Sequence, residues 1–199
     1  MAEEKRFAKE REKIESFSDF SNVYNFKKDF KYSYKTDAGL TEEIVREISA
    51  QKDEPEWMLQ ARLKSLELFY KIDYPTWGPD ISELQMDNIV TYVRPDAGLK
   101  ADWNEVPEDI KDTFDRLGIP EAEKTSLAGV GAQYDSEVVY HSIQEELVKQ
   151  GVVYTDFDTA LKEHEDIVRK HFMKLIPPTD HKFAALHGAV WSGGSFVYV

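Results

Sequence analysis

The sequence predicts an α+β fold that is mainly α-helical and carries a few short strands. Several segments open with a helix-capping residue or a proline and then repeat apolar residues at helical spacing. Other runs are short and rich in β-branched and aromatic residues, which is typical of strands. With 199 residues, of which 41% are hydrophobic, the chain is long enough to bury a core.

The amino-terminal part, residues 1–40, differs in composition from the rest. Residues 1–16 are mostly charged and predict a frayed helix or a disordered tail. Residues 17–34 mix aromatic side chains with three lysines, a combination found in single-stranded nucleic-acid sites. Because three lysines make a small patch in an acidic chain, we expect instead an extended arm that buries its rings on the protein body.

Two helices are predicted next. Thr41 is a good N-cap with two glutamates after it, in the positive first turn, and a second helix begins at Pro55, where the missing N–H costs nothing. Residues at helical spacing predict the buried faces: Ile44, Val45 and Ile48 in the first helix, and Leu59, Leu63, Leu66 and Tyr70 in the second.

The middle of the chain alternates between connectors and short elements. Residues 74–80, with two prolines and a glycine, predict a rigid connector, and residues 89–93 predict a strand that Pro95 ends. An acidic helix begins at Pro107 and stops at Gly118. The further expected elements are a short helix from Pro120 with helical character over 121–128, a helix over 143–149 closed by Gly151, a strand over 152–154, helices over 158–163 and 165–174, and a helix over 180–190 with Phe183, Leu186 and Val190 inward.

The last nine residues carry turn chemistry followed by a strand. Residues 191–195 are rich in Ser and Gly, and residues 196–199 are apolar and β-prone. Because a strand needs a hydrogen-bonding partner, either this one pairs back with residues 152–154 or the natural protein continues past Val199. We expect continuation, so that the chain is the front piece of a longer protein.

Composition excludes several classes of function. The net charge is −13; residues 1–40 hold nine Lys and Arg against eight Asp and Glu, so residues 41–199 carry a net charge of −14. This argues against nucleic-acid or anionic-membrane partners and indicates a solvated surface, with an acidic face for a basic partner as the alternative. The chain has no cysteine, no apolar run of membrane-spanning length and no signal peptide, so we expect a cytoplasmic protein.

No motif predicts a catalytic, cofactor-binding or metal-binding residue, so we expect that this chain is not an enzyme. Gly129-Val-Gly131 suggests a phosphate loop, but Tyr134 stands where a third glycine belongs, and we expect a structural turn. Asp156 and Asp158 are expected to compete as helix caps rather than act as an acid–base pair. No two histidines have the four-residue spacing of a helical metal site, and we expect solvated or capping roles for His141, His164, His171, His181 and His187.

From about Tyr24 to the end, the chain resembles the SufB/SufD family of scaffold proteins in the SUF system of iron–sulfur cluster assembly, and most closely its SufB type. The resemblance lies in dispersed blocks of unusual composition at family-like spacing. These blocks are residues 41–58, 75–84, 106–121, 129–141, 182–186 and 191–199.

The resemblance implies a division of the chain into 1–40 as tail and arm, 41–190 as a helical N-terminal domain, and 191–199 as the first strand of a truncated parallel β-helix. The parent protein is expected to carry an iron–sulfur cluster and to complex with the ATPase SufC and with SufD, and flavin is linked to the intact complex. The family's proposed sulfur, iron and cluster residues lie in the β-helix and beyond. The resemblance therefore assigns no functional residue to this chain.

The expected function is a structural one, in which the segment caps the first coil of the β-helix and offers a docking face without binding a cluster itself. One alternative is an acidic module that binds iron or flavin and contributes directly to the chemistry. Another is a stand-alone interaction protein.

Overall fold

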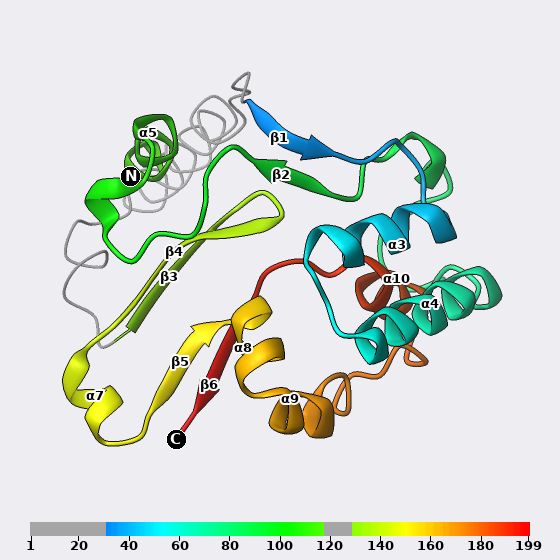
Figure 1. Ribbon diagram of the computed structural model, residues 1–199. Coiled ribbons are helices and arrows are strands. Elements are labelled where there is room, and N and C mark those ends of the chain that lie inside the picture. The colour runs from blue at the N-terminus through cyan, green and yellow to red at the C-terminus, as the bar shows by residue number, and fades with distance from the viewer. Residues whose placement is uncertain (1–30, 118–128) are drawn as a thin grey trace, which may run out of the picture.

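The computed structural model describes residues 31–117 and 129–199, which form helices and short strand pairs (Figure 1). Within these ranges, seven α-helices and three two-stranded antiparallel sheets make a mixed α+β fold, as the sequence predicts. The expectations for residues 1–30 and for helices over 118–128 lie outside the described residues. The missing parallel β-helix stays a prediction.

The elements follow one another with short connections. The helices are α3 (Glu42–Gln51), α4 (Glu56–Lys71), α5 (Glu108–Arg116), α7 (Glu145–Lys149), α8 (Phe157–Glu163), α9 (Glu165–His171) and α10 (Lys182–Val190), with short 3-10 turns at Met86–Asn88 and Trp103–Glu105. The strands are β1 (Tyr32–Lys35), β2 (Val93–Pro95), β3 (Gly129–Tyr134), β4 (Glu137–Ile143), β5 (Val153–Asp156) and β6 (Ser195–Tyr198), paired as β1–β2, β3–β4 and β5–β6.

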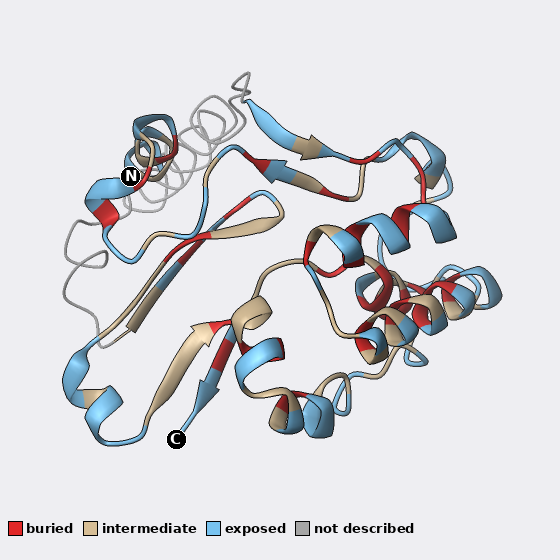
Figure 2. Ribbon diagram, viewed as in Figure 1, coloured by how far each residue is buried: buried red, intermediate tan, exposed pale blue. Residues whose placement is uncertain are grey.

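Helix α3 forms as its sequence predicts. Its N-cap Thr41 accepts a hydrogen bond from the backbone N–H of Ile44 at 3.3 Å, and Ile44, Val45 and Ile48 are buried. Their apolar face lies against the rest of the helical half of the molecule, where red segments gather in Figure 2.

The predicted buried face of α4 was wrong in position. Tyr70 is 64% exposed, and Leu59 and Leu63 are only half-buried. The residues that face the core are Met58, Arg62, Ser65, Leu66 and Phe69. Arg62 and Ser65 stand in this stripe, so hydrophobicity alone assigns the face to the neighbouring leucines.

Helix α10 packs along α4, and its predicted face was also wrong. The expected inward residues of α10 are half-buried, whereas its small residues are buried: Ala184, Ala185, Gly188 and Ala189. A Cβ atom placed on Gly188 would lie 2.4 Å from Ser65 Oγ, so α4 and α10 approach closely there. Small residues let two helix backbones come together, and this contact decides which face is inside.

The strand predicted over residues 89–93 is interrupted and ends later. Only Val93–Pro95 forms the regular strand β2, which pairs with β1, while Val90 makes an isolated bridge to Ala38. Between them, the N–H of Thr36 donates to the carbonyl of Tyr92 at 3.2 Å. The described end of the amino-terminal arm is thus extended and lies along residues 89–96.

The turn predicted at Gly129-Val-Gly131 was wrong, because these residues begin β3 of a hairpin with β4. A Cβ atom on Gly129 would lie 2.5 Å from the ring of Tyr154, so glycine gives room for this ring. The hairpin turns at Asp135, whose φ is 50°. The helix predicted over 143–149 is correspondingly shorter, since Ile143 still belongs to β4.

The carboxy-terminal elements agree with the sequence, although α9 ends at His171 rather than 174. Strand β6 pairs antiparallel with β5, with Tyr198 opposite Val153 and Ser195 opposite Asp156. The pairing back to residues 152–154, the less favoured of the two sequence alternatives, therefore occurs. Continuation past Val199 stays a prediction.

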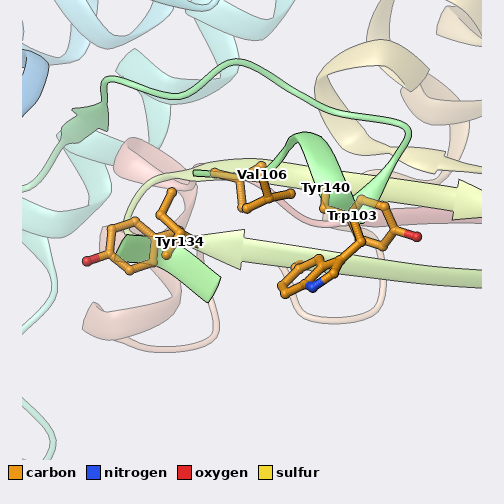
Figure 3. Close-up of a cluster of buried hydrophobic side chains, with 7 residues drawn as sticks. Trp103, Val106, Tyr134 and Tyr140 are labelled. Atoms are coloured by element: carbon orange, nitrogen blue, oxygen red, sulfur yellow. The ribbon is translucent and has the colours of Figure 1, made fainter. Parts of the chain in front are cut away.

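The buried apolar side chains form several clusters. One, in Figure 3, joins the β3–β4 hairpin to Trp103, Val106 and α5, with the Trp103 and Tyr140 rings 5.3 Å apart. A second joins α3, α4 and α10, and a third joins the start of α4 to α8, α9, Trp191 and Phe196. The third cluster connects the helices to β6.

Candidate functional site at the junction of the helices and the last strand

Arg62 on α4 is fully buried and forms a dense set of polar contacts. Its guanidinium binds the Glu54 carboxylate in a bidentate manner, with Nε donating to Oε2 at 2.7 Å and Nη2 to Oε1 at 2.6 Å. Nη1 donates to the carbonyl of Ala189 at 3.1 Å, and Nη2 to that of Trp191 at 2.9 Å. Because the charge is paired and its hydrogen bonds are made, the group can stay ionised in the interior.

These contacts place Arg62 at the carboxy-terminal end of α10. The last carbonyls of a helix lack partners within the helix and carry partial negative charge, so a cation there is favourable. Arg62 also lies over the Trp191 ring, 4.4 Å from its centroid. A side chain of α4 thus fixes the residues through which α10 passes toward β6.

Lys182, the first residue of α10, makes the reciprocal contact. Its Nζ donates to the carbonyls of Phe69 at 2.7 Å and Ile72 at 2.9 Å, which form the carboxy-terminal end of α4. The same ammonium group lies 4.3 Å from the centroid of the Phe69 ring. The two helices run in opposite directions, and each supplies the cation that caps the other.

Trp191 leads from this helix pair into the strand. Its ring packs edge-on against Phe157 at 5.1 Å and near Phe172 at 5.5 Å. Phe196 of β6 is buried in the same cluster. The N–H of Phe157, at the start of α8, donates to the carbonyl of Gly194 at 3.0 Å. The path from α10 to β6 is therefore fixed by both polar and apolar contacts.

Lys52 is a third buried cation and lies at the end of α3. Its Nζ is 2.7 Å from Asp158 Oδ2 and 3.3 Å from Glu137 Oε1, so it joins α3 to α8 and β4. Tyr92 donates a hydrogen bond to Glu137; burial and this contact raise the pKa of the Tyr92 phenol. A polar depression of about 360 Å³ opens beside these groups.

The acidic residues singled out in the sequence have structural roles. Asp156 caps α8, accepting from the Thr159 N–H at 2.9 Å, and Asp158 holds Lys52, so the two do not form an acid–base pair. Their expected competition is settled for Asp156.

The histidines are dispersed. His181 caps α10, accepting from the N–H groups of Phe183 and Ala184, as expected of a capping residue. His164 instead stacks on Phe196, and His141 is half-buried with Nε2 lacking a hydrogen-bond partner among the described residues. Burial lowers the pKa of His141. In the described ranges no three His, Asp or Glu side chains are grouped so as to hold a metal ion, and no helix is long and apolar enough to cross a membrane.

Sequence reasoning missed the three buried cations. A signal for Arg62 exists, because it interrupts the apolar stripe Met58–Ser65–Phe69 at helical spacing. For Lys182 the signal is a lysine in the positively polarised first turn of a helix, where a cation is unfavourable without another partner. Lys52 has no such signal, since its partners come from distant segments.

Comparison with known proteins gives one consistent result. A sequence profile of the SufBD protein N-terminal region matches residues 40–199. The chain is 60% identical over 166 residues to the iron–sulfur cluster assembly protein SufB of Bacillus subtilis strain 168, covering 83% of this chain and 36% of that protein. It is 56% identical over 176 residues to an iron–sulfur cluster assembly SufBD family protein of Staphylococcus aureus strain USA300, covering 88% of this chain and 38% of that protein.

The chain therefore spans little more than a third of the length of these relatives. Its own match runs through almost all of the residues that the structure describes, including the capped helix pair and β6. The chain belongs to the SufBD family, and residues 40–199 are the N-terminal region of that family.

Proposed function

We propose that this chain is the architectural N-terminal region of an iron–sulfur cluster assembly scaffold. Its role is to hold β6 in a fixed position on a helical body. The observation that carries the proposal is the set of contacts of Arg62, which joins α4, Glu54 and the carbonyls of Ala189 and Trp191. The residues that lead into β6 are fixed at the protein interior by a charged group that has no other exit.

The outer side of β6 supports a junction with further structure. Among the described strands, β6 pairs with β5 alone, so its second edge is open. Val197 is 61% and Tyr198 50% exposed, and an apolar groove of about 350 Å³ runs between α9 and this strand. An open apolar edge invites pairing. We propose that residues 41–190 form the helical domain and that residues 191–199 enter the parallel β-helix of a longer parent.

In this proposal, the chemistry belongs to the parent. The relatives are named for iron–sulfur cluster assembly, and this chain contains no cysteine with which to hold a cluster as thiolate-ligated sites do. The parent would act in the cytoplasm in a complex with SufC and SufD. The segment would contribute position rather than ligands.

Anaerobic reconstitution tests the proposal against the alternative of an iron- or flavin-binding module. The 199-residue chain is incubated with ferrous iron and sulfide, and separately dialysed against flavin. The proposal predicts no cluster absorption and no saturable uptake. Stoichiometric, saturable binding of iron, cluster or flavin would contradict it and favour the direct chemical role.

A further inference from the structure

The connector after α4 forms an exposed aromatic surface that the proposed function does not use. Residues Tyr74–Leu84 line a depression of about 560 Å³. Trp77 is 68% exposed beside it, while Tyr74 and Leu84 are partly exposed at 37% and 36%. We call this surface the connector platform. Exposed aromatic side chains gathered at a depression are typical of interaction sites.

The connector platform is anchored on the start of α10. Lys182 holds the carbonyl of Ile72 at its base and lies 4.6 Å from the Tyr74 ring centroid. The Tyr74 ring is 6.1 Å from that of Phe183, and the Trp77 ring meets His181 edge-on at 5.9 Å. The rings are therefore fixed before any partner arrives, which reduces the entropy lost on binding.

The charge around the connector platform has a single sign. From residue 72 to residue 93 the sequence contains four acidic residues and no Lys or Arg. Those four are Asp73, Asp80, Glu83 and Asp87. Among the described residues none of these carboxylates forms an ion pair, whereas Glu67 on neighbouring α4 is paired with Lys64 and Lys71. The platform offers aromatic surface together with unneutralised negative charge.

We propose that the connector platform docks a basic, amphipathic segment of a partner protein. A Lys or Arg of that segment stacks on the open face of Trp77, the best aromatic acceptor of a cation, and an apolar side chain enters the depression between Tyr74 and Leu84. Further basic residues face Asp80 and Glu83, and this complementarity steers the encounter. A second copy of this chain fits less well, because each copy carries a net charge of −13 and an equally acidic platform.

Binding of a defined peptide to the 199-residue chain tests the proposal. The probe is a synthetic amphipathic helix of Leu and Lys, and a helix with Glu in place of Lys is its counterpart. We expect saturable 1:1 binding of the basic peptide in calorimetry. Trp77→Ala should weaken it about tenfold, as loss of an interfacial tryptophan does. Glu83→Gln should weaken it several-fold, and Glu146→Gln, an exposed acid on α7, should leave it unchanged.

Three results would overturn the proposal. The first is unchanged peptide affinity in Trp77→Ala, whose exposed position makes a folding defect unexpected and easily checked by urea unfolding. The second is an equal loss in Glu83→Gln and Glu146→Gln, which indicates unspecific attraction to an acidic protein. The third is a dimer of the chain alone, seen by light scattering and removed by Trp77→Ala, which makes a second copy the occupant.

Discussion

At the scale of residues, buried cations organise the molecule. Arg62, Lys182 and Lys52 each bind oxygen atoms from at least one segment distant in sequence. A buried charge is costly to leave without its partners, so these contacts fix where the segments lie. They stabilise one arrangement of the helices over others that would bury a similar apolar area.

Replacing Arg62 tests the first of these contacts. Arg62→Met leaves the Glu54 carboxylate, whose side chain is 1% exposed, without its counter-charge. We expect a loss of about 3–5 kcal/mol in the free energy of unfolding by urea, as for other buried pairs broken on one side. The matched control is Arg46→Met, because Arg46 pairs with Glu42 on the exposed surface of α3. That control should change stability by no more than about 0.5 kcal/mol.

A loss below about 1 kcal/mol in Arg62→Met would contradict the role given to Arg62, since even a single unsatisfied buried group costs that much. Adding Glu54→Leu should restore part of the lost stability, because the orphaned carboxylate is then removed.

His141 predicts a pH dependence. Burial lowers its pKa in the folded state below the ordinary value of 6.5, although the nearby Asp156 opposes this shift. The unfolded chain therefore takes up a proton first as the pH falls, and stability decreases below the unfolded value of 6.5. Urea unfolding at about pH 7.5 and about pH 5.5 measures this decrease. In His141→Phe it should be smaller; an identical decrease would show that other groups cause it.

At the scale of elements, the contact between α4 and α10 decides the fold of the helical half. The sequence predicts both helices and their caps, because capping and periodicity are local signals. It misplaces their buried faces, because the deciding features are polar or small: Arg62 and Ser65 on α4, and Gly188 on α10. Large apolar residues such as Tyr70 attract the prediction, yet close helix approach excludes them.

Gly188→Ala tests this close approach. An added Cβ would lie 2.4 Å from Ser65 Oγ and 2.8 Å from Ser65 Cβ, so the helices must move apart. Overpacking of a core costs about 1–3 kcal/mol, which exceeds the helix-propensity gain of about 1 kcal/mol for alanine. We therefore expect a net loss of stability in urea unfolding. Gly98→Ala, where a Cβ meets nothing within 4 Å, is the control, and a stabilised Gly188→Ala would contradict the packing.

The hairpin of β3 and β4 shows a second limit of local signals. Gly129 and Gly131 predict a turn by composition, but they lie in a strand where the Tyr154 ring needs their missing side chains. Nothing near these glycines in the sequence announces Tyr154. By contrast, residues 152–154 and 196–199 are found as strands, because β-branched runs next to turn residues are a local pattern.

At the scale of the whole molecule, the candidate site could be predicted only in part. Dispersed blocks along the chain predict the family, which the comparisons confirm. The junction itself could not be predicted, since it joins Glu54, Arg62 and Trp191 from separate segments. Its consequence is that α4, α10 and β6 behave as one unit, and the proposed presentation of β6 depends on this unity.

Hydrogen exchange of the backbone amides of β6 tests this claim most directly. The wild-type chain, Arg62→Met and Arg46→Met are compared under conditions in which all three remain folded. The account predicts that Arg62→Met lowers the protection of β6 and of the end of α10 more than that of the β3–β4 hairpin, while Arg46→Met changes neither. Unchanged protection of β6 in Arg62→Met would contradict the account, because the strand would then hold its place without the arginine.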